Sequence, residues 1–204
     1  MRRLRDLRAW LEYKSLLLKR IYEDRVIGYL DPGAERYLEV FNKPTLLVTT
    51  SSCTGRITVV EGLWHWERGE SRILYKTHDP LDVDTITKHS TRAFSENIWL
   101  KVTGPILHFR TPSLRCASKL LQYARASGFK HSGLLSLNPV EGHTVEVMSG
   151  VQLMIPLRRE GVSLVDRSYL KNIASTASEA LMEGRRRLEM FRSKLSSGLD
   201  ACEP

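Results

Sequence analysis

The chain has 204 residues, of which 42% are hydrophobic and 26% charged, and its formal net charge is +8. These proportions are ordinary for a folded globular protein and argue against a disordered or fibrous chain. No stretch approaches the roughly 20 consecutive apolar residues that a membrane span needs, and the N-terminal segment is too rich in cations for a secretory signal. We therefore expect a cytoplasmic protein with no membrane partner, forming a single domain over residues 1–204.

The cationic surplus is concentrated at the two ends of the chain. Residues 1–20 hold seven Lys or Arg against two acidic residues, and residues 167–194 hold seven against three. Such segments can bind the phosphates of a nucleic acid, because Lys and Arg displace counterions from its backbone. They are equally typical of solvated helix faces in a basic protein. Charge alone leaves both interpretations open.

Hydrophobic periodicity predicts the elements in chain order. The expected helices cover residues 2–22, a short segment after Asp31, 82–93, 113–127 and 166–195. The expected strands cover residues 45–50, 56–61, 72–77, 98–102, 106–110, 134–137, 144–148 and 152–157. The order of these elements favours neighbouring hairpins over crossovers. We therefore expect an α+β fold, with a mixed or largely antiparallel sheet flanked by helices, rather than a Rossmann fold.

Capping residues support several of these helices. Asp31 is a good N-cap, with Pro32 in the first helical position, and Gly128 is a suitable C-cap for the helix over 113–127. In the first helix, leucines at helical spacing, among them Leu7 and Leu11, predict the face that is buried. After the last helix we expect a frayed tail.

The three cysteines are Cys53, Cys116 and Cys202. Their odd number and wide spacing predict neither a disulfide framework nor a structural metal site. Cys53 as a nucleophile would need a lowered pKa and a neighbouring base, and the sequence shows neither. A thiol that packs beneath a loop is the alternative for Cys53.

The densest cluster of small polar groups is Ser51–Arg56, which we expect to form a loop between two strands. Its hydroxyls, its glycine and the Arg56 fork are suited to binding a phosphate or carboxylate. The alternative is a serine-rich turn with Arg56 on the surface. No Gly-rich dinucleotide or phosphate-loop fingerprint accompanies this segment.

Histidines and tryptophans provide further candidate contacts. His78 and His108 lie on predicted strands, where each is either a proton acceptor or an ordinary surface residue. Strand alternation places His108 on one face with Arg110. Trp64 and Trp66 are two residues apart on a predicted hairpin, so they share a face and are candidates for stacking on bases.

Five segments together resemble one known family. Thr49–Ile57, with the sequence TTSSCTGRI, is similar to the signature of the tRNA wybutosine-synthesising methyltransferases of archaeal type. The other four similar segments, in the family's order, are Asp24 with Gly28–Pro32, Leu74–Pro80, Gly104–Phe109 and Gly128–Leu134. The resemblance covers about residues 10–195.

This resemblance implies a specific reaction and a non-Rossmann fold. Members methylate the N-4 ring nitrogen of 7-aminocarboxypropyl-demethylwyosine, beside the anticodon of tRNA-Phe, using S-adenosylmethionine. By motif match it implies Ser52, Cys53, Arg56 and Ser132 as cofactor-binding residues, His108 as a substrate-binding residue and His78 as the catalytic proton acceptor. Arg56 then holds a carboxylate, either that of the cofactor or that of the substrate's aminocarboxypropyl group. The charge of the last helix, and not the resemblance, adds Arg185, Arg186 and Arg187 as substrate-binding residues. The partner is then the anticodon arm of tRNA-Phe. A non-catalytic RNA-binding module of the same pathway is the alternative function.

Two positions depart from the family's pattern. Thr54 stands where the family usually has Ser, which keeps the hydroxyl. Ser178, in the last helix, stands where Asn is expected.

Overall fold

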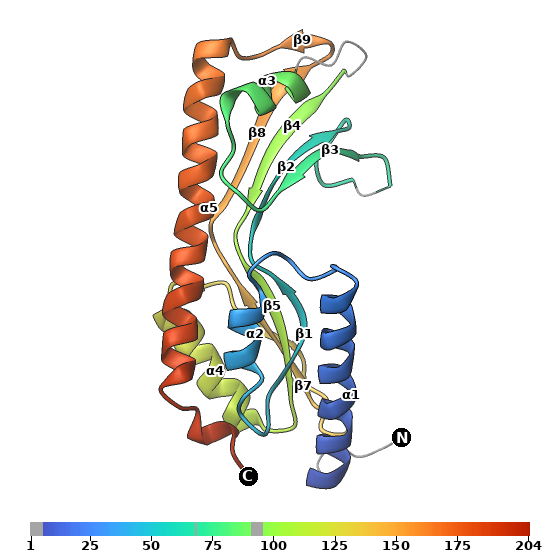
Figure 1. The fold of residues 1–204 in the computed structure, drawn as a ribbon, viewed down its shortest axis with the longest axis vertical. Helices are drawn as coiled ribbons and strands as arrows, with labels where there is room; N and C mark the ends of the chain where they lie inside the picture. Colours follow the sequence, from blue (N-terminus) through green and yellow to red (C-terminus); the bar gives the residue numbers. More distant parts are fainter. Residues whose placement is uncertain (1–5, 68, 91–95) are drawn as a thin grey trace. The chain divides into compact units, whose positions relative to one another are not determined.

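A computed structural model describes residues 6–67, 69–90 and 96–204 (Figure 1). The fold is α+β and contains two antiparallel sheets in place of the one sheet that we predicted. The chain divides into two compact units, described separately below. Unit 1 comprises Met1–Thr54, Pro105–Gly150 and Arg186–Pro204, and unit 2 comprises Gly55–Gly104 and Val151–Arg185. The single-domain count for the whole chain stays a prediction.

The helices and strands follow each other as expected, with two short additions. The helices are α1 Leu7–Val26, α2 Glu35–Phe41, α3 Val83–Ser90, α4 Leu114–Ala126, α5 Arg167–Ser196 and the 3-10 helix Asp200–Cys202. The strands are β1 Val48–Cys53, β2 Arg56–Glu61, β3 Arg72–Thr77, β4 Ile98–Thr103, β5 Ile106–Thr111, β6 Gly133–Ser136, β7 His143–Met148, β8 Gln152–Arg159 and β9 Val162–Ser163. Strand β9 and the 3-10 helix were not predicted. Residues 2–5 and 91–93 of the predicted helices lie outside the described residues.

Unit 1 contains a four-stranded sheet in the order β1-β5-β7-β6. Along β5, Leu107 and Phe109 are buried while His108 and Arg110 are half-buried, so the two sets lie on opposite faces, as strand alternation predicted for His108 and Arg110. The Leu107 face forms the core with α2, α4 and the last turns of α5. The other face meets α1, where the Arg110 guanidinium donates to the Tyr13 hydroxyl at 3.3 Å.

Unit 2 contains a five-stranded sheet in the order β3-β2-β4-β8-β9. Its core lies on one face only, where Ile57 and Val59 of β2 and Leu100 of β4 pack against α3 and the first half of α5. Ile57, Val59 and Leu100 are completely buried. The residues between them in β2 and β4 therefore project from the face away from α5.

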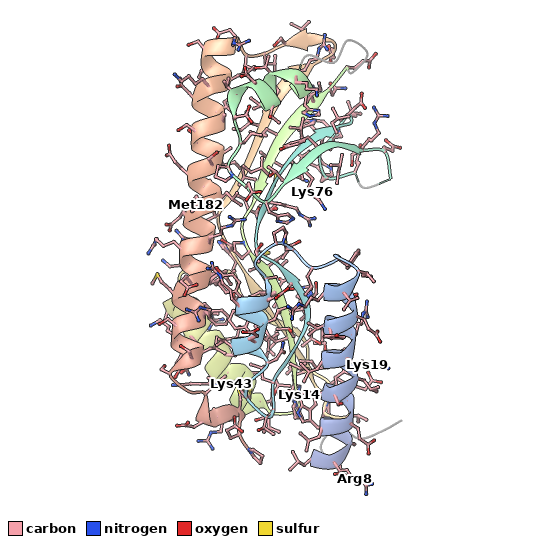
Figure 2. The ribbon with its side chains drawn as sticks, in the orientation of Figure 1. Arg8, Lys14, Lys19, Lys43, Lys76 and Met182 are labelled. Carbon is pink, nitrogen blue, oxygen red and sulfur yellow. A yellow bond between two sulfur atoms is a disulfide. The ribbon has the colours of Figure 1, made fainter. Side chains whose placement is uncertain are left out.

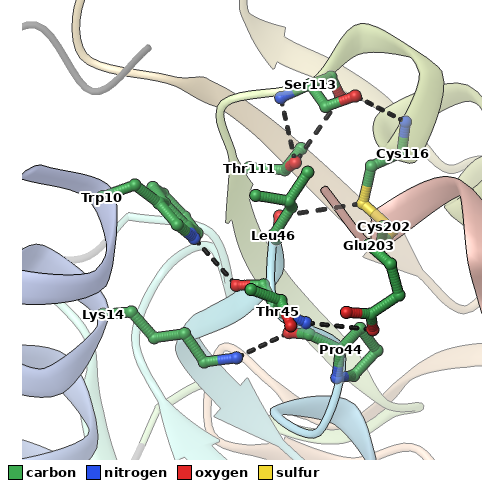
Figure 3. The surroundings of a disulfide bond; sticks show 10 residues. All are labelled: Trp10, Lys14, Pro44, Thr45, Leu46, Thr111, Ser113, Cys116, Cys202 and Glu203. Carbon is green, nitrogen blue, oxygen red and sulfur yellow. Dashed lines mark hydrogen bonds between the residues drawn. A yellow bond between two sulfur atoms is a disulfide. The ribbon is translucent and has the colours of Figure 1, made fainter. Parts of the chain in front are cut away.

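The buried face of α1 differs from the leucine stripe that the periodicity predicted. Trp10 is fully buried and Lys14 is 7% exposed, whereas Leu7 and Leu11 are exposed. Trp10 Nε1 donates to the Thr45 carbonyl at 2.8 Å, and Lys14 Nζ donates to the Pro44 carbonyl at 2.6 Å (Figure 3). Burial lowers the pKa of Lys14, and nearby Glu203 opposes that shift. Hydrogen bonds from Trp10 and Lys14 to the chain before β1 thus orient α1. The spacing of the leucines does not predict these hydrogen bonds.

The C-terminal tail is ordered rather than frayed. Cys202 is fully buried in the 3-10 helix and forms a disulfide with Cys116 of α4 (Figure 3). The prediction of no disulfide is therefore wrong. Spacing is uninformative here because the two cysteines are separated by 86 residues and the fold alone makes them neighbours. Glu203 also accepts a hydrogen bond from the Thr45 N–H at 3.2 Å.

Candidate functional site

A pocket of unit 1 with both polar and apolar walls lies along the edge strand β1. It has a volume of about 280 Å³. Its walls come from the second half of α1, the segment after that helix, α2 and the start of the signature segment, namely Leu17, Arg20, Ile21, Asp24, Tyr29, Leu30, Leu38, Thr49, Thr50, Ser51 and Ser52. Arg20, Asp24 and the hydroxyls supply charge and hydrogen bonds, while the leucines supply apolar surface. This is the mixture that small-molecule sites commonly show.

Part of the segment that we predicted as a loop is a strand, while Thr54 and Gly55 connect it to β2. Ser51, Ser52 and Cys53 are the last residues of β1, which a bulge at Thr50 allows to continue past the expected end. The extra residue of a bulge changes the direction of the side chains that follow it. Because β1 is the edge of its sheet, its outer backbone groups face the pocket and not another strand.

Two side chains fix this strand from outside the sheet. Asn42, after α2, accepts from the Thr49 N–H at 2.7 Å and donates to the Thr49 hydroxyl at 3.0 Å. Asp31 accepts from the Thr54 N–H at 2.9 Å. We predicted that Asp31 caps a helix, and this is wrong, because α2 begins later, at Glu35. Asp31 and Pro32 instead open a turn that Gly33 completes with a φ of 72°.

A row of polar residues crosses the face of this sheet beside α1. Ser51 is paired with His108, and His108 with Glu146. His108 Nε2 lies 3.0 Å from the Glu146 carboxylate, and both side chains are partly exposed. The predicted residues Ser52 and His108 are thus in neighbouring strands of one unit.

His78 belongs to unit 2, where it is buried at the end of β3. Its Nδ1 lies 2.8 Å from the Gly55 carbonyl, the residue before Arg56. A carbonyl only accepts hydrogen bonds, so this contact places the ring proton on Nδ1 and the lone pair of the neutral imidazole on Nε2. The arrangement brings the predicted residues His78 and Arg56 into one neighbourhood.

Helix α5 holds the segment that carries His78. The Arg185 guanidinium donates to the His78 carbonyl. About two turns earlier, the Ser178 hydroxyl accepts from the Leu81 N–H at 2.9 Å and lies 3.3 Å from the Leu81 carbonyl. Ser178, the position that departs from the family's pattern, thus supports the segment from His78 to Leu81.

The three successive arginines of α5 do not form a uniform cationic patch. Arg185 contacts the His78 carbonyl, and in unit 1 Arg187 donates to the Gly128 carbonyl at 3.4 Å. Both are half-buried, whereas Arg186 is exposed and lies against Met190. Of the three, Arg186 is best placed for a phosphate.

Ser132 and Cys53 hold structural positions in unit 1. The Ser132 hydroxyl donates to the Phe129 carbonyl at 2.8 Å and accepts from the Met148 N–H at 3.1 Å, which fixes the turn between α4 and β6. Cys53 is half-buried at the end of β1 and is the cysteine left outside the disulfide.

The search for other site chemistry gives two further results for the described residues. They contain no group of three or more His, Cys, Asp or Glu that would hold a metal ion. None of their helices is both long enough and apolar enough to cross a bilayer.

Sequence reasoning missed Arg20 as a pocket residue. Its only signal was membership of the basic N-terminal segment, which suggested phosphate binding. The helical position of Arg20, one turn before Asp24, places both on the side of α1 that faces β1. The sequence signal for this wall is therefore an arginine and a carboxylate one turn apart, beside Leu17 and Ile21 on the same helix.

The protein has an α+β fold that is not a Rossmann fold, with a pocket of charged, hydroxyl and apolar groups at the edge of one antiparallel sheet. Residues 12–197 match the family model described as Methyltransferase TYW3. The chain therefore belongs to this methyltransferase family, as the five segments indicated.

Curated relatives share most of the chain. A protein of Aeropyrum pernix is 45% identical over 171 residues, covering 84% of this chain and 90% of its own length. One of Saccharolobus solfataricus is 34% identical over 194 residues, covering 93% and 90%. Both are named tRNA(Phe) 7-((3-amino-3-carboxypropyl)-4-demethylwyosine(37)-N(4))-methyltransferase.

Solved structures show the same fold. A hypothetical protein from Aeropyrum pernix has a TM-score of 0.77 and 41% identity, covering 84% of this chain and all of its own. The PH1069 protein from Pyrococcus horikoshii has a TM-score of 0.85 and 27% identity, covering 90% and 94%. These neighbours confirm the predicted α+β, non-Rossmann fold class.

Proposed function

We propose that this chain is a cytoplasmic tRNA methyltransferase. It transfers the methyl group of S-adenosylmethionine to N-4 of 7-aminocarboxypropyl-demethylwyosine in tRNA-Phe. The single observation that carries the proposal is the match of nearly the whole chain to one methyltransferase family, with relatives named for this reaction. The alternative of a non-catalytic RNA-binding module has no observation in its favour.

We place the cofactor in the pocket along β1. An amino acid with a sulfonium and an adenosine group needs a cation for its carboxylate, an anion for its ammonium group and apolar walls for the rest. Arg20, Asp24 and the apolar walls around Leu30 meet these needs within one pocket. Ser52 offers its hydroxyl and its backbone groups at the edge of β1. Cys53 supports the end of this strand, and Ser132 supports the turn before β6. Bound there, the cofactor supplies an electrophilic methyl group.

The chain's own residues then orient the tRNA and remove a proton. The methylated nitrogen loses a proton during the reaction, and we assign its acceptance to His78, whose Nε2 carries the lone pair. Arg56 is suited to the carboxylate of the substrate's aminocarboxypropyl group, because a guanidinium binds a carboxylate through two parallel hydrogen bonds. His108 with Glu146 and the exposed Arg186 are our candidates for further contacts to the anticodon arm.

The test is methyl transfer from labelled S-adenosylmethionine to tRNA-Phe that carries the demethylwyosine precursor. We expect label at the modified base beside the anticodon, and none in tRNA-Phe that lacks the precursor. Several precursor tRNAs run in parallel identify the derivative that is used. Absence of transfer to every correctly modified precursor, with protein that binds the cofactor in calorimetry, would refute the proposal.

A further inference from the structure

The face of the unit 2 sheet that points away from α5 is cationic. Ile57 and Val59 of β2 are in the core, so Thr58 between them projects from the other face. Thr58 is paired with Lys76 of β3 on one side and with Lys101 of β4 on the other, and residues paired across strands share a face. Lys76 is exposed on β3 (Figure 2).

The segment between β2 and β3 lies over this same face. Trp99 precedes Lys101 by two residues in β4, so both project from this face. Trp99 Nε1 donates to the Gly62 carbonyl at 3.1 Å, and Lys101 Nζ donates to the His65 carbonyl at 2.9 Å. Trp99 and Lys101 thus hold the first part of this segment, at Gly62 and at His65 between the two tryptophans.

Trp64 and Trp66 form a stacked pair, which confirms that they share a face. Their ring centroids are 4.8 Å apart and their planes differ by 13°. Trp64 is half-buried, with Trp99 at 6.1 Å and the Arg159 guanidinium 4.9 Å above its ring. We call Trp64 and Trp66 the aromatic ledge.

Trp66 is the open end of this ledge. It is 58% exposed although Trp64 covers one face of its ring. Trp66 is thus a large aromatic side chain with one ring face open, next to His65, whose carbonyl is held by Lys101 of β4. His65 beneath it has its pKa lowered, by burial and then by the nearby Lys101 ammonium, so the ring stays neutral at pH 7 and adds aromatic surface.

We infer that the aromatic ledge and Lys76 form a binding surface for unpaired nucleotides of RNA. Trp66 stacks on one base, and Lys76 contacts the adjoining backbone phosphate. Aromatic rings combined with cations are the usual means by which proteins hold single-stranded nucleic acid. Glu67 and Glu70 belong to the same segment as the ledge, but the exposed Lys76 and the Arg159 guanidinium over Trp64 supply cations on this side of the sheet, which favours RNA over a protein partner. The inference rests on the proposed function, since it supplies an additional contact to the tRNA substrate.

The experiment measures binding of a fluorescein-labelled anticodon stem-loop RNA by anisotropy, without cofactor. Trp66→Ala should weaken binding on the order of tenfold, and Trp66→Phe should retain most of it, because a phenyl ring still stacks. The matched control is Tyr169→Ala, since Tyr169 is 57% exposed and lies on α5. Lys76→Gln should reduce the slope of log Kd against log salt by about one, while Lys88→Gln, at an exposed position on α3, should not.

Three results would overturn the inference. They are an unchanged Kd for Trp66→Ala, an equal loss for Tyr169→Ala, and an equal Trp66 effect on a fully paired RNA duplex, which has no base available for stacking. Methyl transfer separates this inference from the proposed function. Normal methyl transfer together with a Kd that does not depend on Trp66 would refute the inference about the aromatic ledge and leave the proposed function intact. Binding that depends on Trp66, without methyl transfer, would support the ledge and refute the proposed function.

Discussion

Units 1 and 2 each contain an antiparallel sheet, but helices cover the two sheets differently. In unit 1 helices lie on both faces of the sheet, and the polar pocket follows the edge of β1. In unit 2 helices cover one face, and the other carries Lys76, Lys101 and the aromatic ledge. A pocket of about 280 Å³ suits a small molecule, and an open cationic face suits a polymer.

This contrast assigns the two substrates of one reaction to different surfaces. Small-molecule sites need concavity, because most of the ligand's surface must leave water. Nucleic acids are bound by surface charge and exposed rings, which Lys76 and Trp66 supply on the helix-free side of the unit 2 sheet. Variants in unit 1 should therefore alter cofactor binding, and variants on the open face of unit 2 should alter RNA binding.

The largest expected effect concerns stability, since all three cysteines belong to unit 1. A disulfide that closes a loop of 86 residues restricts the unfolded chain, which corresponds to about 4–5 kcal/mol of unfolding free energy. Cys202→Ser should lower the free energy of unfolding by that order, and Cys53→Ser should leave it nearly unchanged. Denaturant unfolding followed by circular dichroism measures both.

The same experiment tests the single-domain prediction. Three of the four tryptophans, Trp64, Trp66 and Trp99, belong to unit 2, so fluorescence reports mainly on that unit. If the chain is one domain, removal of the disulfide shifts the fluorescence and circular dichroism transitions together. A fluorescence transition that stays in place would show that the units unfold independently. One reactive thiol in the denatured, unreduced chain, and three after reduction, would verify the disulfide itself.

The second largest effect is on turnover. Removing a positioned general base typically costs a factor of 10² to 10⁴, and we expect His78→Ala to lower kcat by about 100-fold or more. Cofactor and RNA affinities should stay within a few-fold of the unaltered protein, and added imidazole should restore part of the rate. His89→Ala is the control, because His89 is a second histidine of unit 2, half-buried and stacked on Tyr75. A kcat within threefold of normal for His78→Ala would remove His78 from the reaction.

Periodicity was sufficient for most of the fold because its signals are local. Strands β2 and β3 have the predicted bounds, and α4 begins after its Ser113 cap, whose hydroxyl accepts from the Cys116 N–H at 3.2 Å. The α5 helix begins one residue after the predicted start, where Asp166 accepts from the Tyr169 N–H at 2.7 Å. Alternation and capping depend on neighbours a few residues away, so the sequence alone reveals them.

Apart from the short strand β9 and the 3-10 helix, the errors involve partners that are distant in sequence. Asp31 has the right chemistry for an N-cap, but its carboxylate meets Thr54, 23 residues later. Trp10 and Lys14 are buried because carbonyls before β1 accept hydrogen bonds from them, not because these residues continue an apolar stripe. The bulge at Thr50 likewise depends on pairing with β5. No local pattern encodes these contacts, so the motif residues were identified while the shape of their site was not.

A smaller effect separates the two surfaces directly. Arg20→Gln removes the one cation that lines the β1 pocket, and the loss of a charge-assisted hydrogen bond weakens binding by about 1.5–3 kcal/mol. We expect the Kd for S-adenosylmethionine to rise by at least tenfold in calorimetry, with the Kd for RNA unchanged. Lys19→Gln is the matched control, since Lys19 is the preceding residue of α1, is exposed and does not line the pocket (Figure 2). A change in RNA affinity without a change in cofactor affinity would reverse our assignment of the surfaces.

The smallest effect concerns the support that α5 gives to His78. Ser178→Ala removes the hydrogen bond from the Leu81 N–H, which costs about 1 kcal/mol of unfolding free energy. Since Leu81 lies three residues after His78, we also expect kcat to fall a few-fold while the Kd for the cofactor stays constant. Ser178→Asn provides the informative comparison, because an amide can both accept from and donate to the Leu81 backbone. Recovery of kcat with Asn but not with Ala would show that this hydrogen bond positions His78, and equal rates for all three proteins would limit Ser178 to packing.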